Sequence, residues 1–273
     1  MRTLLSAFAG IAAVVLCLLA VPGLWLDQNV VSEDGFVELA EPLASDGQFQ
    51  EQLAEATART VLENASLGPA LMELARPLVD QAAQNLTENP GYRQAWEETL
   101  RGSHQVTMSG NDASAAVILD IAPIVALAAQ QAADSVGADI QAPEQVLIDV
   151  GGSNQQIIIE IVQNYAQLAV PFAIAAVVAF ALAMLIARRR STTFVLVGIG
   201  VAVAAGLWKL SAEYAMRQIK TSADANELAG LFKTHLTALA EASFNEWILA
   251  GAGAAAVMIL IGLISRVFAG SRT

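Results

Sequence analysis

The sequence predicts an integral membrane protein, built as a four-helix α-helical transmembrane bundle with a helix-rich α+β domain outside the membrane. The chain of 273 residues is 55% hydrophobic and only 15% charged, which is more apolar than a typical soluble domain. Its apolar residues gather in four long runs that contain no acidic residue. Basic residues flank these runs, whereas most acidic residues lie between the first run and the second.

The four runs have about the length of a membrane crossing, because a helix rises 1.5 Å per residue and the hydrocarbon core is about 30 Å thick. We assign transmembrane helices to residues 1–26, 167–187, 193–210 and 247–265. The third run is slightly short, but it ends in Trp208 and Lys209, whose side chains suit the membrane interface.

The first run has two interpretations, a retained membrane anchor or a cleaved signal peptide. It is long for the apolar part of a signal peptide, and it ends in Val21, Pro22 and Gly23 rather than in a small-x-small cleavage site. We therefore expect it to be retained as an anchor. It contains Cys17, the single cysteine of the chain, so no intramolecular disulfide can form.

Arginines at the ends of the runs predict the orientation of the protein. They lie before the first run, in the loop 188–192 and in the tail 266–273, and they are Arg2, Arg188, Arg189, Arg190, Arg266 and Arg272. Because Lys and Arg are retained on the cytoplasmic side, we expect both termini and this loop inside a bacterial plasma membrane. Residues 27–166 and 211–246 are then outside it.

The outer domain, residues 27–166, carries the acidity of the whole protein. It holds 21 Asp and Glu against four Arg and no Lys, a net charge of −17, whereas the whole chain has a net charge of −12. Such a surface repels nucleic acid and anionic headgroups, because both bind cationic partners. We interpret the acidity as that of a solvated exterior rather than of a cation-binding surface.

Residues 27–38, DQNVVSEDGFVE, have the acidic ends of a calcium-binding loop. Such a loop also needs an oxygen ligand at its fifth position and glycine at its sixth, where this chain has Val31 and Ser32. We therefore interpret the stretch as the entry to a helix, with Asp34 as the N-cap.

Most of the outer domain has the apolar spacing of helices. We expect helices over residues 47–64, 67–87, 92–102 and 123–134. Asn89, Pro90 and Gly91 break the chain between the second and the third of them.

Strands are expected where β-branched residues flank a Gly-Asn-Asp turn. Residues 104–108 and 115–121 would form a hairpin, and residues 145–150 would add a third strand. Ser153 is then expected to cap a helix that continues into the second span, with a kink at Pro171.

The outer segment 211–246 contains an amphipathic helix. Its apolar face is formed by Leu228, Leu231, Phe232, His235, Leu236 and Leu239. A helix with such a stripe must bury it against something, so we expect it to pack on the acidic outer domain through Leu231 and Leu236.

Sequence motifs of catalysis are absent, because the chain has no G-x-S-x-G, no phosphate-binding loop and no H-E-x-x-H. Its two histidines, His104 and His235, lack metal-ligand spacing, and we interpret both as structural. The interiors of spans one, two and four hold no charged residue, and the only candidate for an ion path is Lys209, near the outer end of span three. We expect no enzymatic activity, no cofactor and no metal.

Stripes of small residues, in contrast, indicate close helix packing. Gly198, Ala202 and Gly206 recur at every fourth position of the third span. Such a stripe lets helices approach each other closely, which favours a compact bundle over a pore.

Two stretches carry a resemblance to known sequences. Residues 25–55 combine a Trp-x-Asp exit from the first run with the segment AEPLASD, and residues 115–134 hold the strand-to-helix element LDIAP around Asp120. Together they resemble a family of actinobacterial four-span integral membrane proteins of unassigned activity, with an extracytoplasmic domain between spans one and two. The resemblance implies a topology and an envelope location. We expect Asp120 to cap the following helix rather than to bind a ligand.

These observations favour a non-enzymatic cell-envelope protein, an interaction or accessory subunit of a larger membrane complex that acts through its acidic outer domain. The alternative is an extracytoplasmic sensor or binding domain for a small ligand or a cation, formed by the hairpin and by residues 149–154. A transporter or an enzyme is less favoured. The expected partners are the lipid bilayer and another membrane or envelope protein, and not nucleic acid. The residues assigned to interaction or structure are Asp120, Arg188, Arg189, Arg190, Leu231, His235 and Leu236.

Overall fold

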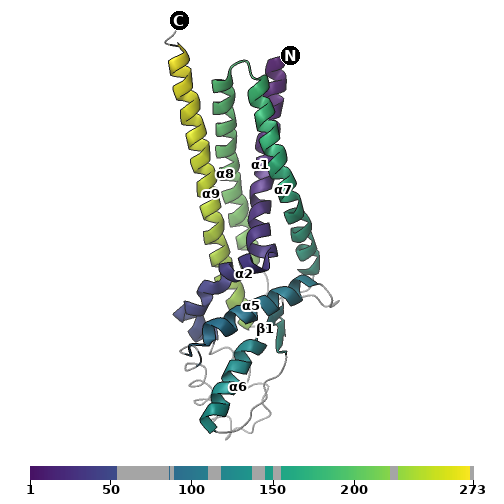
Figure 1. Ribbon diagram of the computed structural model, residues 1–273, viewed down its shortest axis with the longest axis vertical. Coiled ribbons are helices and arrows are strands. Elements are labelled where there is room, and N and C mark those ends of the chain that lie inside the picture. The colour runs from purple at the N-terminus through teal and green to yellow at the C-terminus, as the bar shows by residue number, and fades with distance from the viewer. Residues whose placement is uncertain are drawn as a thin grey trace. The chain divides into compact units, whose positions relative to one another are not determined.

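The computed structural model describes residues 1–53, 86, 89–109, 118–136, 145–149, 155–221 and 227–270. Among these residues, four helices are long and apolar enough to cross a membrane, which confirms the prediction of a helical multi-pass membrane protein (Figure 1). They are α1 (Arg2–Leu26), α7 (Gln155–Ile186), α8 (Arg190–Thr221) and α9 (Glu227–Gly270).

Three of these helices, α7, α8 and α9, extend well beyond the apolar runs that mark the predicted spans, whereas α1 has nearly the predicted bounds. α9 has 44 residues, or about 66 Å at 1.5 Å per residue, which is twice the thickness of the hydrocarbon core. The amphipathic stripe of the segment 211–246 and the last span therefore belong to one helix. α7 likewise continues on both sides of Pro171.

The chain forms two compact units. The membrane unit comprises Met1–Val31, Glu160–Gln218 and Ala240–Thr273, and the acidic unit comprises Ser32–Ile159 and Ile219–Leu239. Because α7, α8 and α9 are longer than a span, each contributes residues to both units.

Glycines allow close approach of helices in the membrane unit. A Cβ atom on Gly23 of α1 would lie 2.9 Å from the Cβ atom of Ala169 in α7. On Gly262 of α9 it would lie 2.5 Å from Cγ2 of Val195 in α8. Real Cβ contacts below 3.0 Å are essentially absent, so a larger residue would force the helices apart.

The predicted stripe of small residues in α8 lies only partly at such a contact. A Cβ atom on Gly198 would lie 3.2 Å from the carbonyl oxygen of Ala255 in α9, whereas Gly206 faces open space. The stripe of small residues thus marks a helix contact at Gly198 but not at Gly206.

An aromatic cluster lies where α1, α8 and α9 meet. Trp208 donates its indole N–H to the carbonyl oxygen of Leu18 at 2.9 Å, and Trp25 donates to the hydroxyl of Ser243 at 3.1 Å. Trp25 also packs edge-on against Phe244 at 5.3 Å between ring centroids. A buried Trp usually finds a hydrogen-bond partner for its indole N–H in this way, and Trp is enriched at membrane interfaces.

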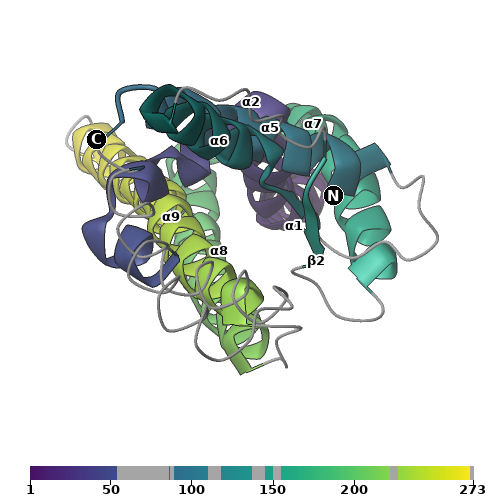
Figure 2. The same cartoon turned by 90° about the horizontal axis from the view of Figure 1, so that it is seen from below.

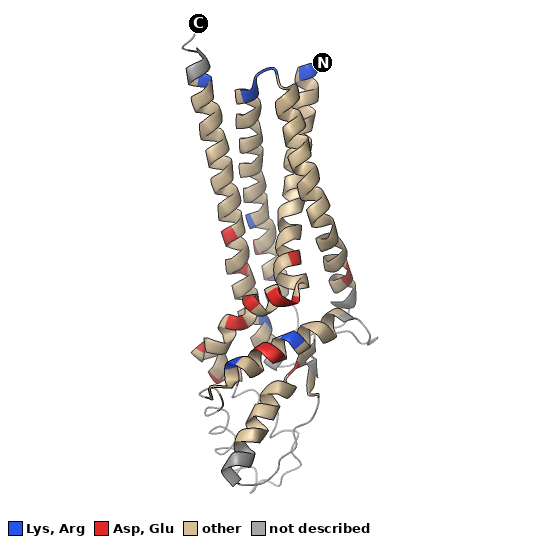
Figure 3. Ribbon diagram, in the orientation of Figure 1, with Lys and Arg blue, Asp and Glu red and all other residues tan. Residues whose placement is uncertain are grey.

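Charged residues divide between the two ends of the membrane unit (Figure 3). At the end where α1 begins and α9 ends are Arg2, Arg188, Arg189, Arg190 and Arg266. At the opposite ends of the same helices are Asp27, Glu160, Glu213, Glu241 and Glu246. Lys209 lies at this acidic end, with its Nζ atom 3.0 Å from Asn245 Oδ1 and 3.4 Å from a carboxylate oxygen of Glu213.

Within the described residues, the acidic unit consists of helices and one strand pair (Figure 2). Its elements are α2 (Glu33–Ala40), the 3-10 helix η2 (Glu41–Ser45), the helical residues 47–53, α5 (Tyr92–Ser109), β1 (Ile118–Asp120), α6 (Ala122–Val136) and β2 (Leu147–Asp149). The two strands are antiparallel, with Leu119 opposite Ile148. The rest of the predicted helix 47–64, nearly all of the helix 67–87 and the predicted cap Ser153 lie outside the described residues.

The entry to the acidic unit is helical, but its cap differs from the prediction. Residues Asp27–Val31 continue α1 as a π-helical turn. Ser32, and not Asp34, is the N-cap of α2, because its extended backbone lets the hydroxyl accept from the Gly35 N–H at 3.4 Å. Asp34 lies in the first turn, where a carboxylate interacts favourably with the helix dipole.

The predicted hairpin of residues 104–108 with 115–121 is wrong. Residues 104–108 continue helix α5, and β1 pairs instead with β2. The physical reason lies in two hydroxyls of α5 that face the strand. Ser103 accepts from the Asp120 N–H at 2.9 Å, and Thr107 accepts from the Ile118 N–H at 3.2 Å.

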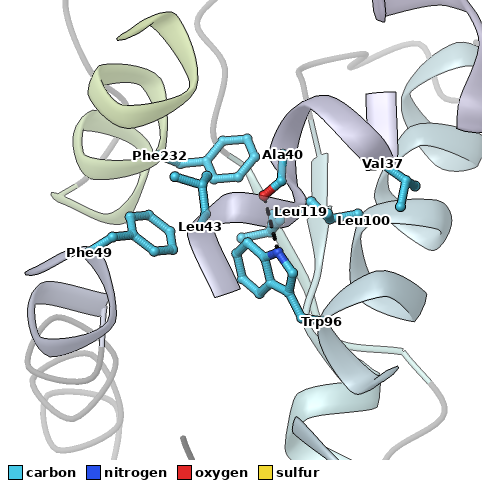
Figure 4. Packing of buried hydrophobic residues seen from close by; sticks show 8 residues of the cluster. All are labelled: Val37, Ala40, Leu43, Phe49, Trp96, Leu100, Leu119 and Phe232. Carbon is cyan, nitrogen blue, oxygen red and sulfur yellow. Dashed lines mark hydrogen bonds between the residues drawn. The ribbon is translucent and has the colours of Figure 1, made fainter. Parts of the chain in front are cut away.

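The core of the acidic unit gathers side chains from distant parts of the chain (Figure 4). It consists of Val37, Ala40, Leu43, Phe49, Trp96, Leu100, Leu119 and Phe232. Trp96 lies at its centre, 1% exposed, and its indole N–H donates to the Ala40 carbonyl oxygen at 3.4 Å. Phe49 packs edge-on against Trp96 at 5.7 Å between ring centroids. Burial of this aromatic pair is worth several kcal/mol.

Candidate functional site

Asp120 lies at the end of β1 and holds two backbone groups in place. Its Oδ1 atom accepts from the Ala122 N–H at 3.0 Å, at the start of α6, and from the Val146 N–H at 3.2 Å, beside β2. The carboxylate thus joins the helix start to the strand pair. Its oxygen is used for local structure, as in other Asp residues that precede helices.

His235 lies against a helix start in the acidic unit. Its Nδ1 atom is 3.8 Å from Oδ2 of Asp46, and its ring packs edge-on against Phe49 at 5.1 Å. Asp46 in turn accepts from the N–H groups of Gln48 and Phe49, both at 3.0 Å. The other histidine, His104, is buried in α5 beside Phe36.

The N-terminal turns of α9 pack on the core of the acidic unit. Phe232 is a member of the core, and Leu231, Leu236 and Leu239 lie against it, half-buried. Within the described residues, the structure thus brings together Leu231, Leu236 and the ring of His235 on one side of this unit.

Two arginines of α5 form ion pairs with carboxylates of α2 and η2. Arg101 lies 2.9 Å from Glu33 and 2.7 Å from Asp34 of α2, and Arg93 pairs with Glu41 of η2. The side-chain amide of Gln105 and then the guanidinium of Arg101 hold the pKa of Glu33 below its usual value. The hydrogen bonds that Arg101 donates to Asp34 and Glu33 raise the pKa of Arg101.

The arginines of the α7–α8 loop border a cavity of the membrane unit. The cavity has a volume of about 690 Å³ and lies between α1 and α8. Arg188 and Arg189 line one end, whereas Val14, Val15 and Gly200 line the other. Arg190 is the first residue of α8 and does not line the cavity.

Hydroxyl groups lie next to these arginines. Thr3 and Ser6 of α1 and Thr192 and Thr193 of α8 line the same end of the cavity. Ser6 donates to the carbonyl oxygen of Ala183 in α7 at 2.9 Å and is 3.5 Å from the hydroxyl of Thr193. The cavity is therefore polar and cationic at one end and apolar along the rest of its length.

From the sequence, Arg188 and Arg189 are markers of orientation and candidates for interaction or structure, but nothing there predicts a cavity beside them. Thr3, Ser6, Gly10 and Gly200 have no predicted role. The sequence does show hydroxyl residues near the arginines at the ends of the first and third spans. These hydroxyls and arginines lie close together only because α1 packs on α8, which the sequence does not indicate.

In the described part of the chain, no three His, Cys, Asp or Glu side chains lie close enough together to hold a metal ion.

No protein-family model, curated protein or solved structure matches this chain.

Proposed function

We propose that this protein is a non-enzymatic subunit of a bacterial cell envelope, which binds another membrane or envelope protein through its acidic unit. Both termini and the loop 188–192 would lie in the cytoplasm, and the acidic unit outside the plasma membrane. The observation that carries the proposal is the separation of charge. Arginines gather at one end of the membrane unit, and the net charge of residues 27–166 is −17.

The ion pairs within the acidic unit support the proposal that its surface is a negatively charged binding site. Both described arginines of this unit, Arg93 and Arg101, pair with its own carboxylates. Glu38, Glu51 and Glu98 are exposed. A basic patch on a partner would find complementary charge there, which favours rapid and specific association.

The chemistry of the described carboxylates favours binding over catalysis. General acid and base catalysis needs a carboxylate whose pKa is raised toward neutrality, usually in an apolar pocket. Glu33 has the opposite shift, since its pKa is lowered, and Asp120 is used for backbone contacts. The resemblance to actinobacterial four-span proteins supports the envelope as the place of action.

The sensor alternative has lost one of its two sequence features. It used a hairpin of residues 104–108 with 115–121, and helix α5 includes residues 104–108. Its other feature, residues 149–154, lies almost entirely outside the described part of the chain.

The test is purification of the tagged full-length protein from its native membranes in a mild detergent, followed by mass spectrometry. We expect a stoichiometric partner that the variant E38Q/E51Q retains at a markedly lower level. The matched control is E160Q/E246Q, which removes two exposed carboxylates from the membrane unit instead.

A protein that purifies alone, or only with copies of itself, would contradict the proposal. Equal retention of the partner by both double variants would contradict the role of the acidic surface. Stabilisation of the full chain by a small ligand, without any partner, would favour the sensor alternative.

A further inference from the structure

We propose that the cavity between α1 and α8 binds one anionic phospholipid. Its headgroup would lie at Arg188 and Arg189, and an acyl chain would follow the apolar part of the cavity. This site is separate from the acidic unit, and the proposal does not depend on the identity of a protein partner.

The cationic end of the cavity has the chemistry of a phosphate site. Arg188 and Arg189 are both exposed, and no ion pair or hydrogen bond within the described residues occupies their guanidinium groups. Guanidinium groups bind phosphate oxygens through paired N–H donors. The hydroxyls of Thr3 and Thr192 add neutral donors at the same end.

Helix α8 begins at this end and adds to the positive potential. The carbonyl oxygen of Arg189 accepts from the N–H groups of Thr192 and Thr193 at 3.1 and 3.2 Å, which fixes Arg189 at the start of α8. The helix has 32 residues, and the N-terminus of a long helix favours an anion. The helix start and the two arginines therefore act on the same small volume.

The apolar part of the cavity takes up most of the length of an acyl chain in one leaflet. Its lining on α1 extends from Ala7 to Val15, or about 12 Å at 1.5 Å per residue, whereas half of the hydrocarbon core is about 15 Å. Ile11, Val14 and Leu196 line this part. With the headgroup at the arginines, the acyl chain would lie at the same depth as the acyl chains of the surrounding bilayer.

Small residues line the cavity between the larger side chains, and they are Ala7, Gly10 and Gly200. Gly200 lets α1 and α8 approach closely beside the cavity, since a Cβ atom there would lie 2.6 Å from Cγ2 of Val14. A larger residue at Ala7, which is exposed on α1, would fill the cavity without entering a buried helix contact. The described lining contains two arginines and no acidic residue, so an anionic lipid is favoured over a zwitterionic one.

The test uses the full-length protein in detergent and native mass spectrometry. The probes are palmitoyl-oleoyl phosphatidylglycerol and palmitoyl-oleoyl phosphatidylcholine, which share their acyl chains and differ in headgroup charge. We expect the wild-type protein to retain one phosphatidylglycerol in clear preference to phosphatidylcholine. In R188Q/R189Q the affinity for phosphatidylglycerol should fall by at least about tenfold, since each arginine near a lipid surface contributes about 1 kcal/mol.

Two matched controls separate this site from general effects. R190Q/R266Q removes two charges from the same end of the membrane unit but from outside the cavity, and it should retain the lipid. Ala7→Leu should abolish retention, whereas Ala254→Leu, on an exposed position of α9, should not. Gel filtration and the melting temperature of each variant show that it is folded.

Four results would overturn the proposal, three on headgroup recognition and one on the acyl-chain site. The first three are equal retention of the two lipids by the wild-type protein, undiminished retention by R188Q/R189Q, and an equal loss in R190Q/R266Q. The fourth is that Ala7→Leu binds phosphatidylglycerol as the wild-type protein does.

Discussion

Single polar side chains decide several local structures of this protein. The hydroxyl of Ser32 rather than the carboxylate of Asp34 caps α2, and Asp34 is left to pair with Arg101. Glu33 pairs with the same arginine. Two neighbouring carboxylates of the first helical turn thus neutralise a single cation of α5, which ties the two helices together by charge.

The pairing of Glu33 makes the acidic unit sensitive to acid. Its pKa in the folded state is lowered from the ordinary value of 4.5 by the hydrogen bond from Gln105 and by Arg101. Because the folded state holds the carboxylate in its charged form, this stabilisation is fully present above pH 4.5 and is lost as the pH falls through the lowered pKa. The melting temperature of Glu33→Gln should therefore depend less on pH below about 4.5 than that of the wild-type protein.

The measurement is a series of melting curves from pH 6 to pH 3 in one detergent. Glu98→Gln, an exposed change on the same helix as Arg101, is the control and should follow the wild-type protein. If Glu33→Gln has the same acid dependence as the wild-type protein, Glu33 does not contribute to it.

Elements of the membrane unit could be predicted well, whereas those of the acidic unit could be predicted only in part. Apolar runs identify spans because the bilayer requires length and composition alone. Residues 104–108 mislead because their composition suits a strand as well as a helix. What decides between them is the contact of Ser103 and Thr107 with β1, and a distant contact of this kind is not visible in the local sequence.

The cavity between α1 and α8 was missed for the same reason. Arg188 and Arg189 were noted, but the cavity exists only because α1 packs beside α8. Span order along the sequence does not say which spans are neighbours in the bundle, and short-range spacing cannot supply this information.

The first turns of α9 are expected to stabilise the acidic unit. Leu231 and Leu236 lie against its core, half-buried. The double variant L231D/L236D should destabilise this unit by about 3 to 5 kcal/mol, because two apolar contacts are lost and two charges must be desolvated. A lower melting temperature and faster proteolysis within residues 32–109 would report the change.

Ala238→Asp is the control for this variant, since Ala238 is exposed on the same turns of α9. It should leave both readouts unchanged. Unchanged stability in L231D/L236D would show that these contacts do not hold α9 to the core.

At the scale of the whole molecule, the distribution of charge predicts which parts face each side of the membrane. Cys17 is the single cysteine, so Cys17→Ala gives a background without thiols. In that background we expect Gln52→Cys to react with a membrane-impermeant maleimide on intact cells. Val267→Cys, at the arginine end of α9, should react only after the membrane is opened.

The opposite labelling pattern would invert the topology. Labelling of both cysteines on intact cells would contradict the assignment of cytoplasmic termini. Either outcome would remove the separation of charge as a basis for the proposed function, while the lipid measurement in detergent would still stand.

The glycines of the membrane unit also determine how freely its sequence can change during evolution. Gly23, Gly251 and Gly262 have neighbouring atoms within 3.0 Å of where a Cβ atom would lie, whereas Gly206 and Gly253 have none within 4 Å. All five positions hold glycine, but we expect selection against larger side chains only at the first three. Relatives of this protein should keep glycine at the first three and accept alanine or larger residues at the last two.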